Sequence, residues 1–112
     1  MSEIKQLIDE LILFRDERNW KQFHSSKDLA LAISIEAAEL NELFLWKKED
    51  EEDQIEEEKL RDELADIFAF CLLLANKHNL DVKDIVLEKI HKNNEKYPVE
   101  KARNSARKYD TL

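Results

Sequence analysis

Residues 27–46 read KDLALAISIEAAELNELFLW, and this stretch determines what kind of fold the chain can adopt. Leucine, isoleucine and alanine occupy nearly every side of a helix drawn through it. This pattern is typical of a central helix packed by several neighbours. Two glutamates, Glu36 and Glu39, are conspicuous because they stand among these apolar residues.

Three other segments carry helical periodicity. Apolar residues recur at helical spacing from Ile4 to Ile12, and we expect this first helix to end near Asn19. A third helix is predicted over roughly residues 56–78, with its second half buried. A fourth helix is predicted to begin near Val82 and to end before Pro98.

Short polar residues mark two of the predicted helix starts. Ser25 with Asp28, and Asp81 with Asp84, have the three-residue spacing of N-terminal capping pairs. The chain of 112 residues contains no glycine and one proline. Because hairpin turns, phosphate-binding loops and dinucleotide-binding turns depend on glycine, sheet-rich folds are disfavoured. The sequence therefore predicts an all-α fold. A chain this short buries a thin core, so self-association is expected.

Charge is unevenly distributed along the chain. The formal net charge is -8, from 18 basic and 26 acidic residues. Residues 1–88 hold 23 acids and 11 bases, whereas residues 89–112 hold 3 acids and 7 bases. The run KKEDEEDQIEEE at residues 47–58 is predicted to be a solvated loop. An acidic body with a small basic tail makes a nucleic-acid binder the weakest of the function classes considered.

The single cysteine, Cys71, lies inside an apolar run and is predicted to be a small buried hydrophobic residue. A protein without an internal disulfide fits a reducing compartment. The first residues, MSEIK, lack the apolar core of a signal peptide, and no apolar run has the length of a membrane span. We therefore expect a cytoplasmic protein that is neither exported nor inserted into a membrane.

A second acidic pair, Glu63 and Asp66, repeats the three-residue spacing of Glu36 and Glu39. Each pair lies among apolar residues, where an ionised carboxylate is costly unless it meets a cation. If the two helices pack antiparallel, the four carboxylates converge into an oxygen-only ligand set suited to Mg²⁺ or Mn²⁺. The scattered histidines disfavour zinc. Charged residues at this spacing are also ordinary on solvated helix flanks, so pairing with lysine or arginine is the alternative.

The order of these motifs resembles that of the all-α MazG-like nucleoside triphosphate pyrophosphohydrolases, which share the pattern E-x-x-E…E-x-x-D. Here 23 residues separate the two acidic pairs. The stretches NWKQFH at 19–24, KYPV at 96–99 and ARNSARKY at 102–109 narrow the resemblance to the dCTP pyrophosphatase branch. The resemblance extends over almost the whole chain.

This resemblance implies a four-helix bundle completed by homo-oligomerisation, as a homodimer or homotetramer. It implies one domain over residues 1–112, with a basic tail from about residue 98. The positions that match the catalytic metal ligands are Glu36, Glu39, Glu63 and Asp66. The positions that match the nucleoside pocket are Trp20, Lys21, Gln22, Phe23, His24, Trp46 and Phe70.

The basic end of the chain is expected to contact phosphate. Carboxylates alone repel a triphosphate, so a bound metal ion must make the electrostatic potential at the cluster positive. Basic side chains would add direct contacts to the phosphates. The candidates are Lys96, Arg103, Arg107 and Lys108, with Asn93 and Tyr97 as neutral donors. Taken one by one, these residues can equally be solvated or intersubunit, and the tryptophans can equally pack at a subunit rim.

Three positions depart from the family pattern. Ile35 stands where the broader family often has a glutamate directly before the first metal ligand, so no general base is assigned there. Leu11 and Phe70 stand where animal members carry His and Tyr. Because these polar groups are missing, the sequence leaves base and sugar preference open.

The acidic pairs and the family resemblance together imply a Mg²⁺-dependent pyrophosphohydrolase. It would cleave a deoxynucleoside triphosphate to the monophosphate and pyrophosphate. The favoured substrate is dCTP or a modified dCTP, and the expected role is housecleaning of the nucleotide pool. Cleavage between the α and β phosphates needs an aimed water and charge neutralisation, and metal ions provide both. The alternatives are a non-catalytic helical oligomerisation module and a protein that senses a nucleotide without cleaving it. Neither a nucleic acid nor a membrane is expected as a partner.

Overall fold

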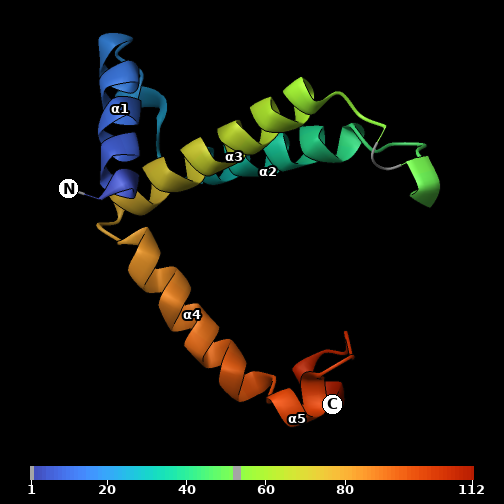
Figure 1. Ribbon diagram of the computed structural model, residues 1–112. Helices are drawn as coiled ribbons and strands as arrows, with labels where there is room; N and C mark the ends of the chain where they lie inside the picture. Colours follow the sequence, from blue (N-terminus) through green and yellow to red (C-terminus); the bar gives the residue numbers. More distant parts are fainter. Residues whose placement is uncertain (1, 52–53) are drawn as a thin grey trace. The chain divides into compact units, whose positions relative to one another are not determined.

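The computed structural model describes residues 2–51 and 54–112. Every regular element in these residues is helical, which confirms the all-α prediction (Figure 1). Its contacts divide the chain into two compact units, Met1–Asn79 and Leu80–Leu112. The single domain expected over residues 1–112 stays a prediction. Within the described ranges, no helix has both the length and the apolar character needed to cross a membrane.

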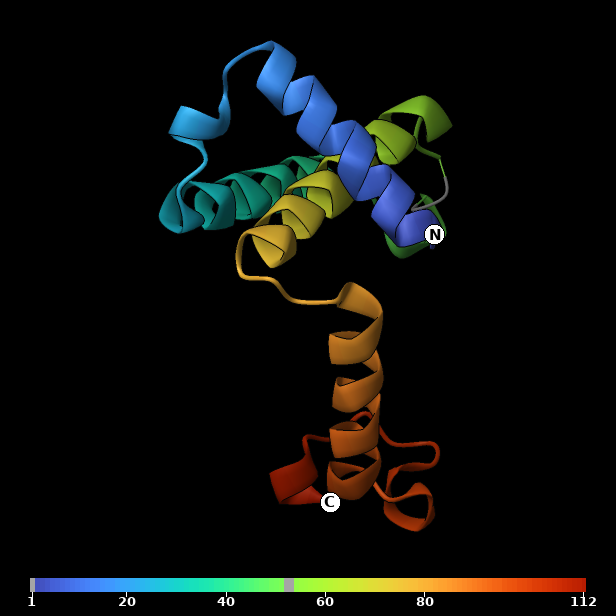
Figure 2. The same cartoon turned by 90° about the vertical axis from the view of Figure 1, so that its left-hand side faces the viewer.

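The first unit contains three long helices. Its elements are α1 (Glu3–Glu17), η1 (Lys21–Phe23), α2 (Ser26–Glu42), η2 (Glu49–Glu51) and α3 (Glu57–Lys77). Helices α2 and α3 run antiparallel and side by side, and α1 lies across this pair (Figures 1 and 2). The acidic run at 47–58 contributes η2 and the start of α3, while its residues 52–53 lie outside the described ranges.

The predicted caps hold two of the helices. The Ser25 hydroxyl accepts a hydrogen bond from the Asp28 backbone N–H at 3.1 Å, at the start of α2. The Asp81 carboxylate accepts one from the Asp84 N–H at 3.0 Å, at the start of the fourth long helix. Each bond satisfies a backbone donor that has no partner inside its helix. Both capping predictions are confirmed.

Helix α2 ends at Glu42, so the helix expected over residues 27–46 stops short of Trp46. The chain leaves the helix through a turn in which the Phe44 N–H bonds the Asn41 carbonyl at 3.0 Å. Trp46 itself adopts φ 64°, a left-handed conformation that a helix interior excludes. Among residues 2–51 and 54–112, the other left-handed positions are taken by Asn19, Asn79 and Asn104. In a chain without glycine, asparagine is the residue that adopts this conformation at least cost.

The core of the single chain is small, and three burial predictions fail wholly or in part. Among the described residues, those that are buried are Ile8, Leu29, Leu73 and Ala75. Helix α2 is not surrounded, because Ile35 is 58% exposed, and in the second half of α3 Phe68 is 64% exposed. Cys71 is also exposed rather than buried. The physical reason is that α2 meets α3 along one face and has too few neighbours within its unit to cover the rest.

The second unit contains α4 (Val82–Lys96), α5 (Val99–Ala102) and η3 (Tyr109–Thr111). Helix α4 ends before Pro98, as predicted. The tail folds back on the end of α4, where the Tyr109 ring meets the Tyr97 ring edge-on at 6.1 Å (Figure 1). The Lys96 ammonium lies 5.0 Å from the centre of the same Tyr109 ring.

Candidate metal centre

Three of the four predicted ligands meet at the α2–α3 interface. One carboxylate oxygen each from Glu36 and Glu39 of α2 and from Glu63 of α3 lie within 4.8 Å of one another. The two α2 residues share a face because they are three positions apart. Helix α3 packs antiparallel to α2 (Figure 1), and its Glu63 lies beside that face. The result is a compact group of oxygen ligands drawn from two helices.

The carboxylates in this group lack cationic partners. The Oε2 atoms of Glu36 and Glu63 are shielded from solvent and have no hydrogen-bond partner among the described residues. In that same part of the chain, no lysine or arginine forms an ion pair with Glu36, Glu39 or Glu63. Buried polar atoms are normally paired, so two unpaired carboxylate oxygens are an exception that calls for a ligand. This weighs against the alternative that these acids lie on solvated helix flanks and pair with lysine or arginine.

The electrostatics of the cluster favour a bound positive charge. Partial burial raises the pKa of Glu36 from an ordinary 4.5 to about 7, and the nearby Glu39, Glu63 and Asp66 carboxyl groups add to this rise. Burial also raises the pKa of Glu63, with further contributions from the charges of Glu39 and Asp66. Like charges held together disfavour ionisation of each member. The Glu36 and Glu63 carboxylates are therefore stabilised by a proton or by a cation.

Asp66, the fourth predicted ligand, lies just outside this group. It is exposed on α3, one turn beyond Glu63, and none of its oxygens belongs to the set within 4.8 Å. Its charge nevertheless raises the pKa of both Glu36 and Glu63, so it lies close enough to act on the cluster.

The predicted nucleoside segment presents aromatic rings to solvent. Trp20 packs edge-on against Phe14 at 5.7 Å, and Phe23 is exposed. Trp46 is 90% exposed, so its ring has no packing role within the described chain. The Gln22 side chain donates a hydrogen bond to the Asn19 carbonyl at 2.9 Å, which steadies the turn before α2. Phe70 is half-buried on α3.

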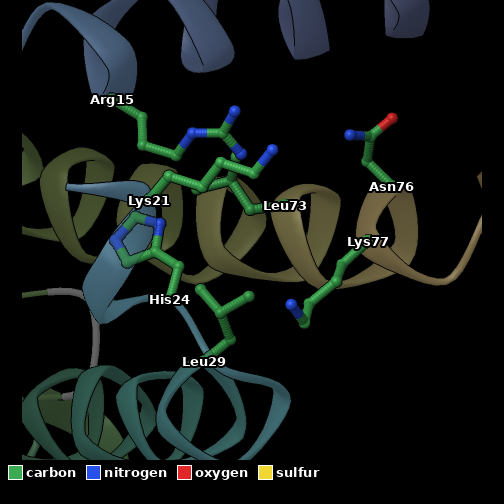
Figure 3. Close-up of a pocket in the computed structure, with 7 residues that line it drawn as sticks. All are labelled: Arg15, Lys21, His24, Leu29, Leu73, Asn76 and Lys77. Atoms are coloured by element: carbon green, nitrogen blue, oxygen red, sulfur yellow. The ribbon is translucent and has the colours of Figure 1, made fainter. Parts of the chain in front are cut away.

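His24 and Lys21 lie in a pocket of about 340 Å³ that the sequence did not reveal (Figure 3). Its lining consists of Arg15, Lys21, His24, Leu29, Leu73, Asn76 and Lys77. Burial and the neighbouring Arg15 charge lower the pKa of His24, so its ring is neutral near pH 7. The lining residues Arg15, Asn76 and Lys77 were missed. No spacing signal exists for them, because they come from helices far apart in sequence.

The predicted phosphate contacts belong to the second unit. Asn93 and Tyr97 are half-buried there, and Lys96 packs beside Tyr109. The exposed residues among these candidates are Lys96, Arg103, Arg107 and Lys108. Their role toward a phosphate stays a prediction.

Comparison with known proteins agrees with this arrangement of helices. The sequence profile of the MazG-like family matches residues 31–112, which include both acidic pairs. The chain belongs to the MazG-like family.

Curated relatives of this MazG-like chain include dCTP pyrophosphatase 1 of Mus musculus. It is 38% identical over 104 residues, which cover 88% of this chain and 61% of the mouse protein. The Bos taurus dCTP pyrophosphatase 1 is 39% identical over 104 residues, covering 88% of this chain and 62% of its own. The MazG-like chain thus spans about three fifths of the length of these relatives.

A solved structure supports the fold of this MazG-like chain directly. A pyrophosphatase from Archaeoglobus fulgidus superposes with a TM-score of 0.83 at 36% sequence identity. The match covers 88% of this chain and 94% of the archaeal one. The match therefore extends over most of the residues of both chains.

Proposed function

We propose that this MazG-like protein is a nucleoside triphosphate pyrophosphohydrolase that depends on Mg²⁺. The observation that carries the proposal is the group of three carboxylate oxygens, from Glu36, Glu39 and Glu63, that lie within 4.8 Å of one another. In addition, the Oε2 atoms of Glu36 and Glu63 are shielded from solvent and have no hydrogen-bond partner among the described residues. The names of the relatives, dCTP pyrophosphatase 1 and pyrophosphatase, point to the same chemistry. The reaction would convert a deoxynucleoside triphosphate to the monophosphate and pyrophosphate.

The donor set fits a hard divalent cation. Glu36, Glu39 and Glu63 would hold Mg²⁺ or Mn²⁺, and Asp66 would complete the set, because these cations prefer oxygen ligands. A bound cation would neutralise the triphosphate and activate a water for attack on phosphorus. The protein's own contribution is to keep the carboxylates converged and partly screened from solvent. Glu36 would hold a cation in its deprotonated form and would release its proton on binding one, since its pKa of about 7 keeps it partly protonated near pH 7.

The substrate would be a deoxynucleotide, with dCTP or a modified dCTP favoured by the branch resemblance. The rings of Trp20, Phe23, Trp46 and Phe70 offer flat surfaces on which a base can stack, a contact of about 1–3 kcal/mol per base. Leu11 and Phe70 have no polar side-chain atoms. We therefore expect stacking to contribute more to base recognition than hydrogen bonds from these two positions.

The triphosphate would be steadied by basic side chains in the second unit. The candidates stay Lys96, Arg103, Arg107 and Lys108, with Asn93 and Tyr97 as neutral donors. Hydrogen bonds from a charged side chain to phosphate are stronger than those between neutral groups, so a few such contacts would be enough to hold the triphosphate.

The working protein would be a homodimer or homotetramer. Exposed apolar side chains on α2, α3 and α4 support this, among them Ile35, Phe68 and Ile90. A small core with large apolar side chains left open is the situation in which a second copy stabilises the fold. The acidic body argues against a nucleic-acid partner.

The decisive experiment is pyrophosphate release from each dNTP in the presence and absence of Mg²⁺. We expect activity with Mg²⁺, highest on dCTP, and a fall of about 100-fold or more in Glu36→Gln and Asp66→Asn, because each loses a metal ligand. Asp62→Asn is the matched control, since it removes a carboxylate on α3 outside the cluster and should keep full activity.

Circular dichroism should be measured to check that each variant is folded. Absence of cleavage on every dNTP, or full activity in both ligand variants, would contradict the proposal. Binding of a dNTP without release of product would support the nucleotide-sensing alternative instead.

A further inference from the structure

Three cationic side chains from three elements meet in the pocket beside His24. Arg15 comes from α1, Lys21 from η1 and Lys77 from the last turn of α3, and no carboxylate lines the pocket. In Figure 3 the Arg15 and Lys21 side chains enter from one side of the view, and Lys77 enters from the other. Such a concentration of positive charge is unusual in a unit that is strongly acidic overall.

Most of this positive charge is uncompensated. The Arg15 Nε donates to the Asp16 carboxylate at 2.9 Å, which leaves the two terminal nitrogens of the guanidinium for another acceptor. Across the described ranges, neither Lys21 nor Lys77 forms an ion pair. The Arg15 side chain is 14% exposed, so its charge acts in a partly desolvated setting where electrostatic interactions are stronger than in water.

Neutral groups complete a lining that suits an oxyanion. Asn76 offers an amide, and His24 holds a shielded Nδ1 without a hydrogen-bond partner among the described residues. Leu29 and Leu73 are buried and give the pocket a firm apolar base. The volume of about 340 Å³ falls in the range of small-molecule sites.

We propose that this pocket binds a phosphate-type oxyanion, held by Arg15, Lys21 and Lys77. The anion is either free phosphate or pyrophosphate, or the phosphate group of a nucleotide. The arginine guanidinium can donate two parallel hydrogen bonds to a phosphate, and each lysine ammonium adds a compact positive charge. This combination recurs in phosphate recognition. None of the clustered carboxylates lines this site, so it is distinct from the proposed metal centre. It shares Lys21 and His24 with the expected nucleoside pocket, so the inference rests in part on the proposed function and adds a phosphate contact to it.

The test is titration calorimetry on the full chain without divalent metal. The ligands are inorganic phosphate, pyrophosphate and dCMP, with uncharged deoxycytidine as the reference. We expect binding of at least one phosphate compound and none of deoxycytidine. Lys21→Gln and Lys77→Gln should each weaken that binding about tenfold or more, since each removes a charge-assisted hydrogen bond. Lys59→Gln is the matched control, an exposed α3 lysine that pairs with Glu56 and should leave binding unchanged.

The outcomes separate the two sources of the anion. Binding of inorganic phosphate or pyrophosphate would support a free-anion site, and binding of dCMP alone would support a nucleotide phosphate. No binding of any phosphate compound, or equal binding in both lysine variants, would overturn the proposal. Loss in Lys21→Gln without loss in Lys77→Gln would also overturn it. Glu36→Gln should keep full phosphate affinity, so failure here is distinguishable from failure of the proposed metal centre.

Discussion

At the scale of single residues, Glu36 joins the sequence to the proposed chemistry. Its position among apolar residues of α2 shields one of its oxygens, and its neighbours place further negative charge around it. A carboxyl group in this setting favours its protonated form when no cation is present. Titration of Glu36 therefore reports on the cluster without any substrate.

The metal-free protein should lose stability as pH rises from about 4.5 to about 7, because the folded state holds the Glu36 proton over this range and the unfolded state releases it. Melting temperatures measured in a chelator at several pH values should therefore fall more steeply with pH for the wild type than for Glu36→Gln. Added Mg²⁺ should raise the melting temperature above about pH 7, where it replaces the proton.

Glu42→Gln, at the end of the same helix and outside the cluster, should keep the wild-type pH dependence. Identical pH profiles for the wild type and Glu36→Gln would show that the Glu36 carboxyl group is solvated as in the unfolded chain.

At the scale of elements, capping side chains determine where the helices begin. Ser25 places the start of α2, and Asp81 places the start of α4. The register of α2 in turn determines which of its residues face α3, and therefore whether Glu36 and Glu39 reach Glu63. A local hydrogen bond thus contributes to the geometry of the cluster.

Removal of a cap should destabilise the protein without changing its fold. Ser25→Ala should lower the free energy of unfolding by about 1 kcal/mol, because the Asp28 N–H loses its acceptor. Urea denaturation followed by circular dichroism measures this change. Ser34→Ala, in the interior of α2, is the control and should be neutral or slightly stabilising, since alanine favours helix interiors. Equal stability of Ser25→Ala and wild type would mean that solvent replaces the cap at no cost.

At the scale of the whole molecule, exposed apolar surface is the dominant feature. Ile35 and Phe68 lie open on α2 and α3, and the buried residues of the described chain are few. Burial of a large apolar side chain contributes about 1.5–3 kcal/mol, so covering several of them outweighs the cost of association. We therefore expect these faces to lie between copies of the chain.

A charge placed on this surface should disrupt assembly. Phe68→Glu should shift the sedimentation coefficient toward that of the monomer, because the new carboxylate would be buried without a partner. Gln54→Glu adds the same charge at an exposed loop position and should leave the assembly intact. A wild-type protein that sediments as a monomer, or a Phe68→Glu variant that assembles normally, would contradict this expectation.

The sequence by itself determined the all-α class, the capped starts of α2 and α4 and the repeated spacing of the acidic pairs. These features depend on hydrogen bonds and periodicity within a few residues, so they can be read locally. Packing between helices distant in sequence decided that Glu63 lies beside Glu36 and Glu39. It also left Asp66 outside the group of clustered oxygens and Cys71 exposed. It also brought Arg15 and Lys77 to one pocket. No local pattern encodes such meetings, because they arise only when segments far apart in sequence bury their apolar faces against one another.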